Sequence, residues 1–109
     1  MAVVRRVLAQ SNPAADTDTE IYDVPDATEV VISSLIVANR SATPTKFRAW
    51  IRIDNAALDD KQYFAYDVPI EGNESLAIGH GITASHDDRF YVRADDATLS
   101  FTLYGQEIS

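Results

Sequence analysis

The chain has 109 residues, of which 46% are hydrophobic and 24% are charged, a composition typical of one globular domain and not of a disordered chain. Nine Lys and Arg against seventeen Asp and Glu give a formal net charge of −8. A chain of this charge repels a phosphate backbone, so nucleic acid is not an expected partner. The absence of cysteine excludes disulfides, zinc–thiolate sites and thiol catalysis.

No apolar run approaches the roughly 20 residues that span a bilayer, and the N-terminus lacks the apolar core of a secretory signal. The sequence therefore predicts no membrane partner. Along the chain, two weaker strands are predicted first, at Arg5–Ala9 and Glu20–Val24. The longest apolar segment, EVVISSLIVAN at Glu29–Asn39, is rich in β-branched residues on both alternating faces. This pattern predicts a strand that is covered on both sides or that bends between two packed layers.

The clearest alternation follows in KFRAWIRI, Lys46–Ile53, where apolar residues on one face alternate with Lys46, Arg48, Trp50 and Arg52 on the other. Period-2 alternation of this kind predicts a half-buried strand. Further strands are predicted at Tyr63–Val68, Ser75–Ile78, Arg89–Ala94 and Leu99–Tyr104.

The segments between these strands are rich in turn-forming residues, and only NAALDD at residues 55–60 could hold a helical turn. About eight short strands at this spacing predict an all-β fold, a single-domain antiparallel β-sandwich of which the jelly roll is one form. Residues 1–13 are expected to form an N-terminal arm or first strand, and residues 14–109 the sandwich domain.

The sequence offers little catalytic machinery. The two histidines, His80 and His86, lie in one glycine-containing stretch, and no nucleophile elbow, zinc-protease motif or phosphate-binding loop is present. We therefore expect no enzyme activity, no cofactor and no metal. The acidic pairs are interpreted as solvated turn caps, with calcium binding as the alternative. These pairs are Asp59-Asp60, Asp87-Asp88 and Asp95-Asp96.

Basic residues fall mainly within strands and acidic residues mainly in turns. Two strands each place an aromatic residue between two arginines, on the face opposite the apolar set, so these side chains are expected to point outward. They are Arg48, Trp50 and Arg52 on one strand and Arg89, Tyr91 and Arg93 on the other. Trp, Tyr and Arg are enriched at protein–protein hot spots, and a neighbouring subunit with acidic turns would complement them. The alternative is that these side chains cover their own fold and that Trp50 is buried within the monomer.

Five segments carry a resemblance to a known group of proteins. They are IYDVP (21–25), VVISSLIVANRSATPTKFRAWIRI (30–53), YFAYDVPI (63–70), NESLAIGHGITA (73–84) and FYVRADDATLSFTLYGQEIS (90–109). Asn39-Arg40-Ser41 after the long strand and the LSF…GQEI ending are the most typical features. In these segments the chain resembles the small virion structural proteins of tailed bacteriophages.

The resemblance implies a non-enzymatic particle component, located in the virion after assembly in the bacterial cytoplasm. The first hypothesis is a capsid decoration (cement) protein that binds the major capsid protein from outside. Such a protein is expected to be a homo-oligomer, and a trimer is the expected form. Residues 2–13 would then be an arm that reaches a neighbour by strand addition, with Arg5 and Arg6 anchored on acidic capsid surface.

Two alternatives belong to other classes. One is a tail or baseplate accessory protein that binds other tail proteins. The other is a carbohydrate-binding host-recognition module, with Trp50, Tyr63, Tyr66 or Tyr91 as platforms on which a sugar ring stacks.

Overall fold

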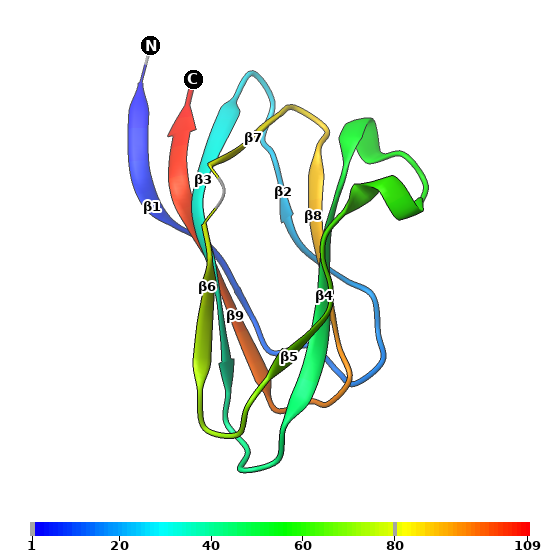
Figure 1. The fold of residues 1–109 in the computed structure, drawn as a ribbon. Helices are drawn as coiled ribbons and strands as arrows, with labels where there is room; N and C mark the ends of the chain where they lie inside the picture. Colours follow the sequence, from blue (N-terminus) through cyan, green and yellow to red (C-terminus); the bar gives the residue numbers. More distant parts are fainter. Residues whose placement is uncertain (1, 80) are drawn as a thin grey trace.

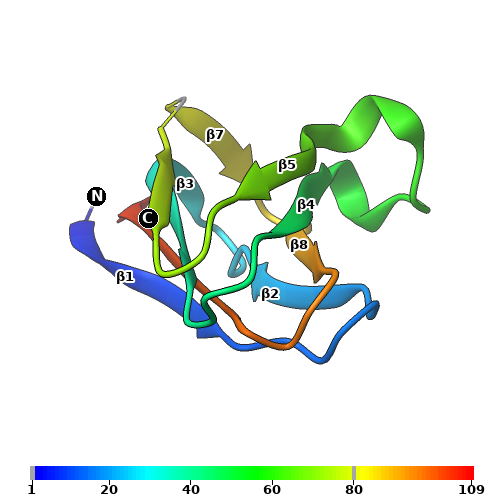
Figure 2. The same cartoon turned by 60° about the horizontal axis from the view of Figure 1, so that its bottom comes forward.

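The computed structural model describes residues 2–79 and 81–109 and shows two antiparallel sheets packed face to face (Figure 1). The turned view in Figure 2 separates the two layers. Sheet A contains five strands, β1 (Val3–Ser11), β3 (Glu29–Asn39), β6 (Ser75–Ile78), β7 (Ile82–Ser85) and β9 (Leu99–Ile108). Sheet B contains four, β2 (Thr19–Asp23), β4 (Thr45–Arg52), β5 (Tyr63–Ile70) and β8 (Arg89–Ala94). The predicted all-β sandwich is confirmed.

The strand orders are those of a jelly roll. Sheet A runs β1-β9-β3-β6, with β7 paired to the other half of β3, and sheet B runs β2-β8-β4-β5. When β6 and β7 are taken as two halves of one interrupted strand, these are the two four-stranded sheets of a jelly roll. The connection from β4 to β5 stays within sheet B, and β6 and β7 both belong to sheet A, whereas the other connections between successive strands pass from one sheet to the other.

The core forms where the apolar faces of the two sheets meet. In β9, burial alternates along the whole strand, with Leu99, Phe101 and Leu103 at 1% exposure or less. The rings of Phe101 and Phe47 meet edge to face across the core, 5.8 Å apart. Burial of each large apolar side chain contributes about 1.5–3 kcal/mol, and this alternation therefore fixes which face of each strand points inward.

Most strand boundaries match the sequence patterns, and the main differences concern β9, β7 and the segment between β4 and β5. The strand β9 continues to Ile108, beyond the predicted end at Tyr104, because Gly105 lies within it. A Cβ at Gly105 would sit 2.1 Å from the carbonyl oxygen of Val31 on the neighbouring strand, so the glycine allows a close backbone approach. The short strand β7 was not predicted. The sequence allows a helical turn only at residues 55–60, and the structure has two short 3₁₀ helices at the ends of this segment, Ile53–Asn55 and Asp60–Gln62.

Candidate functional site

The predicted outward-facing residues lie together on the outer face of sheet B, which we call the charged face. Its centre is Trp50 on β4. The Trp50 ring stacks on that of Tyr91 on β8, with 5.6 Å between the ring centres and 14° between the planes, and its centre lies 5.3 Å from that of the Tyr63 ring on β5. Trp50 is only 1% exposed. Trp50 thus lies on the predicted outer face of its strand, but two tyrosine rings of the neighbouring strands cover the indole. The alternative, that Trp50 is buried within the monomer, is the one the structure shows. A buried Trp50 also cannot serve as a sugar-stacking platform in this conformation.

Arg48 is held by carboxylate and aromatic groups of its own chain. Its Nε donates to Asp67 Oδ1 at 2.7 Å and its Nη2 to Asp67 Oδ2 at 3.3 Å. The guanidinium also lies 4.1 Å from the centre of the Tyr66 ring. The hydrogen bond from Arg48 lowers the pKa of Asp67 and raises the pKa of Arg48. Asp67 adopts a positive φ of 50° at an irregular point of β5.

The remaining arginines of this face also have partners in the same chain. Arg89 pairs with Glu20 at 3.1 Å, a contact that raises the pKa of Arg89, and Arg93 pairs with Asp18 at 3.1 Å. Arg52 donates to the carbonyl of Ala56 at 2.7 Å. The carboxylates expected from a neighbouring subunit are thus supplied by the same chain, by Glu20 on β2, Asp67 on β5 and Asp18 just before β2. Exposed ion pairs contribute about 0–1 kcal/mol each. Arg48, Arg89 and Arg93 are matched by carboxylates, whereas Arg52 is held by a backbone carbonyl and by the Tyr91 ring.

The outer face of sheet A has a different composition, and we call it the neutral face. Its outward positions follow from the strand register and the alternation of burial. Among these positions, only Arg5 and Glu29 are charged. The others are Val3, Val7, Gln10, Val31, Ser33, Ile36, Ala38, Ser75, Ala77, Thr83, Ser85, Ser100, Thr102, Tyr104, Gln106 and Ile108.

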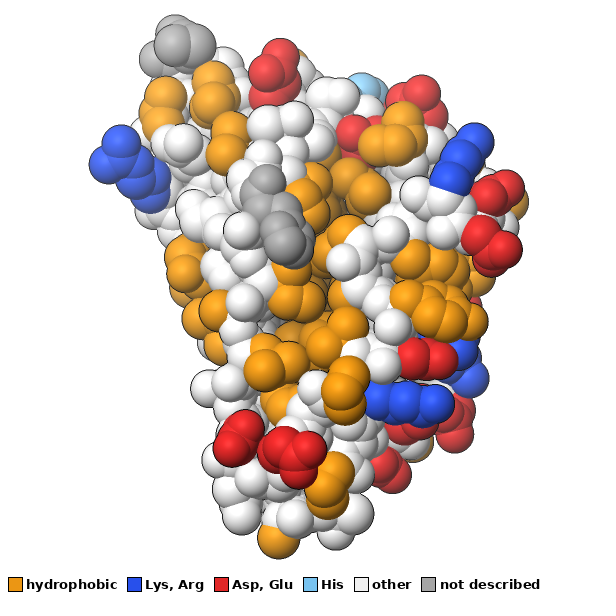
Figure 3. All heavy atoms as spheres, viewed as in Figure 1, with side chains coloured by type: hydrophobic (Ala, Val, Ile, Leu, Met, Phe, Trp, Pro, Cys, Tyr) orange, Lys and Arg blue, Asp and Glu red, His pale blue; other side chains and the backbone are white. Residues whose placement is uncertain are grey.

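Apolar side chains also reach the surface beside the neutral face. Figure 3 shows hydrophobic side chains along the seam between β6 and β5, with acidic and basic side chains over β4 and β5 and at the two ends. The partly buried residues Leu76, Ile78 and Val68 belong to the strands that border this seam. Apolar surface therefore extends from sheet A to the open edge of the sandwich.

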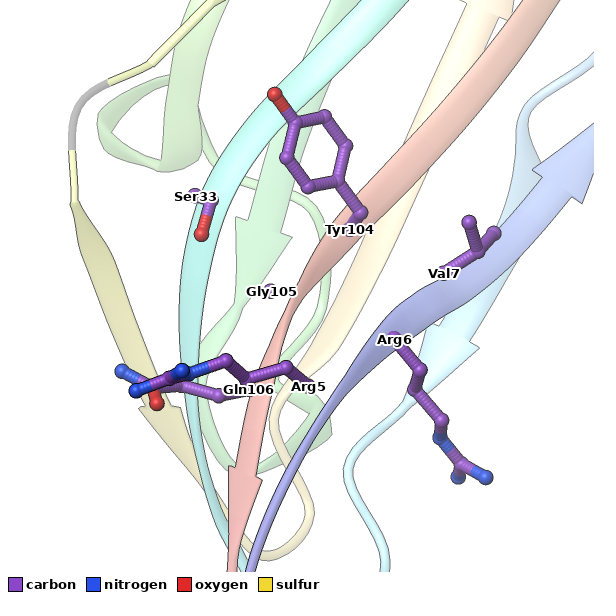
Figure 4. Close-up of a pocket in the computed structure, with 7 residues that line it drawn as sticks. All are labelled: Arg5, Arg6, Val7, Ser33, Tyr104, Gly105 and Gln106. Atoms are coloured by element: carbon purple, nitrogen blue, oxygen red, sulfur yellow. The ribbon is translucent and has the colours of Figure 1, made fainter.

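A shallow hollow of about 440 Å³ lies on the neutral face, where β1, β3 and β9 meet. Both neighbours of β9 are irregular here, since register shifts occur between Val7 and Ala9 and between Ile32 and Ser34. Bulges of this kind bend a strand and increase its twist. Figure 4 shows Arg5 and Gln106 extending side by side across the sheet, while Arg6 points the other way.

The two arginines of β1 differ in their partners. Arg6 pairs at 2.6 Å with Glu107, a buried carboxylate that also accepts a 2.5 Å hydrogen bond from the hydroxyl of Tyr22. Burial, together with the bond to Glu107, raises the pKa of Tyr22. This contact ties β1 and β9 to β2 of the opposite sheet. For Arg5, no hydrogen bond or ion pair occurs within residues 2–79 and 81–109. Within residues 1–13, expected to be an arm or first strand, Val3–Ser11 form the edge strand β1.

The acidic pairs examined as turn caps or calcium ligands act as caps at two positions. Asp88 is 4% exposed and accepts from the backbone N–H groups of Asp54 and Ser85, both at 2.9 Å. Asp59 accepts from the N–H of Lys61. Within the described part of the chain, no group of three or more His, Asp or Glu side chains could hold a metal ion.

His86 contacts Asp26 at 2.5 Å in an exposed turn, and His80 lies outside the described residues. No helix in the described ranges is long and apolar enough to cross a membrane. Comparison with protein-family models, with curated proteins and with solved structures finds no match.

Proposed function

We propose that this protein is a non-enzymatic structural component of a virus particle, a capsid decoration protein of a tailed bacteriophage. In this proposal the protein forms a homotrimer, and its subunits contact one another through the neutral face of sheet A. The observation that carries the proposal is the near absence of charge on this face in a chain of net charge −8. Two copies of such a chain repel each other, and contact costs least where the surface has the fewest charges.

Two further observations support the same function. The jelly roll recurs in viral capsid domains, although a fold alone does not assign a function. The resemblance of the sequence to small virion proteins indicates the same class of assembly. The charged face supports the choice of sheet A, because its arginines already have partners within the chain and gain less from a second subunit.

Light scattering of the purified protein tests the assembly. We expect a mass near three times 12.0 kDa that persists at high salt, because an interface with few charges is hardly screened. Thr102→Lys, at the middle of the neutral face, should shift the mass to that of a monomer. The matched control Ala97→Lys, which adds the same charge in an exposed turn, should leave the mass unchanged. A wild-type monomer at both salt concentrations would contradict self-assembly through this face.

Immunogold labelling of purified phage particles tests the location. We expect particles made from the genome that encodes the chain to be labelled on their heads. Labelling confined to tails would replace the decoration proposal with the tail accessory alternative. Particles without label would overturn the virion proposal altogether.

A further inference from the structure

The two sheets of the described structure have four edges, and three of them are poorly suited to further pairing. The edge at β2 has five residues and a register shift, and the edge at β5 contains Pro69 and two register shifts. The opposite edge of sheet A is divided between β6 and β7, each of four residues. Short, bulged or proline-containing edges are the usual means by which proteins prevent strand addition.

The fourth edge, β1, lacks these features over its first half. It has nine residues, and its register with β9 is uninterrupted from Val3 to Val7. Ala2 and Ser109 exchange both backbone hydrogen bonds, at 2.8 and 2.9 Å. Because hydrogen-bonded and non-hydrogen-bonded pairs alternate in an antiparallel ladder, Val4 and Arg6 bond to β9, whereas Val3 and Arg5 turn their N–H and C=O groups toward the free edge.

The side chains at this edge indicate the chemistry of a partner. Arg5 is the one arginine in residues 2–79 and 81–109 without a hydrogen bond or ion pair, and it lies on the neutral face. Val3 and Val7 flank it on the same face and are 49% and 53% exposed. A guanidinium pairs most strongly with a carboxylate, which it binds through two parallel hydrogen bonds.

We propose that β1 accepts an extended acidic segment of a partner protein as an additional strand of sheet A. Backbone groups of Val3 and Arg5 form the new ladder, a carboxylate of the segment pairs with Arg5, and apolar side chains cover Val3 and Val7. This contact goes beyond the proposed function, because it uses the free backbone groups of the β1 edge, at the margin of the neutral face, and takes a partner of stated chemistry. A second β1 strand is a poorer occupant, since symmetric antiparallel pairing centred on Arg5 or Arg6 places like charges opposite each other.

The test uses short synthetic peptides and the full chain. The first peptide has one glutamate between two valines and threonines at the alternate positions, and the second has lysine in place of the glutamate. Amide hydrogen exchange measured by NMR should show that the glutamate peptide protects the amides of Val3 and Arg5. It should bind about tenfold more tightly than the lysine peptide, the ratio expected for one charge-assisted pair. Arg5→Glu should reverse this order, and Arg5→Lys should keep it.

Three results would overturn the inference. In the first, the exchange rates of the Val3 and Arg5 amides do not change with either peptide. In the second, both peptides bind equally well. In the third, the same amides become protected without peptide as the protein concentration rises, which would assign the edge to a second copy of the chain. Because particle labelling does not depend on this edge, labelled heads without peptide binding would overturn this inference alone.

Discussion

Glu107 is a buried carboxylate on which side chains from two other strands converge. Tyr22 from β2 and Arg6 from β1 donate to its two oxygens at 2.5 and 2.6 Å. A buried charge is costly unless it is paired and hydrogen-bonded. The two contacts therefore explain how Glu107 is tolerated at 9% exposure, and they make this group a link between the two sheets.

Tyr22→Phe should lower the free energy of unfolding by about 1–3 kcal/mol, because the buried carboxylate loses a donor. Urea denaturation at neutral pH measures this change. Since the pKa of Tyr22 is raised above its ordinary value of 10.0, the stabilisation is present below that pH and is lost as the pH rises further. Tyr104→Phe is the control, because the Tyr104 hydroxyl has no hydrogen bond to the described residues. Equal losses in the two variants would contradict a specific role for the Tyr22 hydroxyl.

Asp67→Asn should reduce stability at neutral pH, and the difference from the wild type should vanish in acid. The pKa of Asp67 is lowered from 3.8 by the hydrogen bond from Arg48. Its stabilisation is therefore complete above that value and is lost as the pH falls through the lower native pKa. Thermal unfolding measured from pH 7 to pH 2 follows this change, with Glu74→Gln as a control at an exposed position. A difference in melting temperature that stays constant over this range would contradict the assignment.

The position of Trp50 marks the limit of what could be predicted for single residues. The alternation in Lys46–Ile53 places Trp50 on the outer face of its strand, and the structure confirms that face. The alternation does not reveal that Tyr63 and Tyr91 lie beside the indole, because that depends on the pairing of three strands that are distant in sequence. Side-chain direction was thus predictable, whereas exposure was not.

At the scale of elements, the two edges of β1 differ. One edge forms hydrogen bonds with β9, and the other has no strand beside it. The register predicts that the N–H of Arg6 is used within the sheet and the N–H of Arg5 is not. Proline removes an N–H and is tolerated only where that group is free.

The Arg5→Pro variant should therefore have the same free energy of unfolding as the Arg5→Ala variant. The Arg6→Pro variant should be about 1–3 kcal/mol less stable than the Arg6→Ala variant, because it loses a hydrogen bond of the β1–β9 ladder. Urea denaturation of the four variants measures both differences, and the alanine variants separate the backbone effect from the loss of the arginine side chain. An equal effect of proline at both positions would show that the register of β1 is wrong.

The elements that could be predicted are those with a complete pattern within the strand. Glu29–Asn39, Ser75–Ile78 and Arg89–Ala94 match β3, β6 and β8 at both ends. The strand β7 was missed because ITAS follows Gly79 and Gly81, which indicate the end of a strand, although Ile82 and Ala84 do alternate with Thr83 and Ser85. The extension of β9 beyond Gly105 depends on how closely β3 approaches, which no local pattern contains.

At the scale of the whole molecule, the two sheets divide the surface by charge. Glu20 on β2, Asp67 on β5 and Asp18 just before β2 pair with the arginines of sheet B, while the outward positions of sheet A are mostly small, apolar or amide side chains. The sequence contains the signal for the neutral face, since Ser100, Thr102, Tyr104 and Gln106 alternate without a charge. The extent of the neutral face could not be predicted from these residues, because it depends on the position of β9 between β1 and β3.

The central place of β9 in sheet A has a consequence for the order of events during synthesis. This strand is the last in the chain, yet it separates β1 from β3 and pairs with both along most of its length. Until Leu99–Ile108 has left the ribosome, β1 has no strand to pair with in sheet A, and the core lacks Phe101 and Leu103. Because its non-local pairings close last, the domain should fold after translation of its final strand, and chaperones would meet the nascent chain with its valine-rich first strand unpaired.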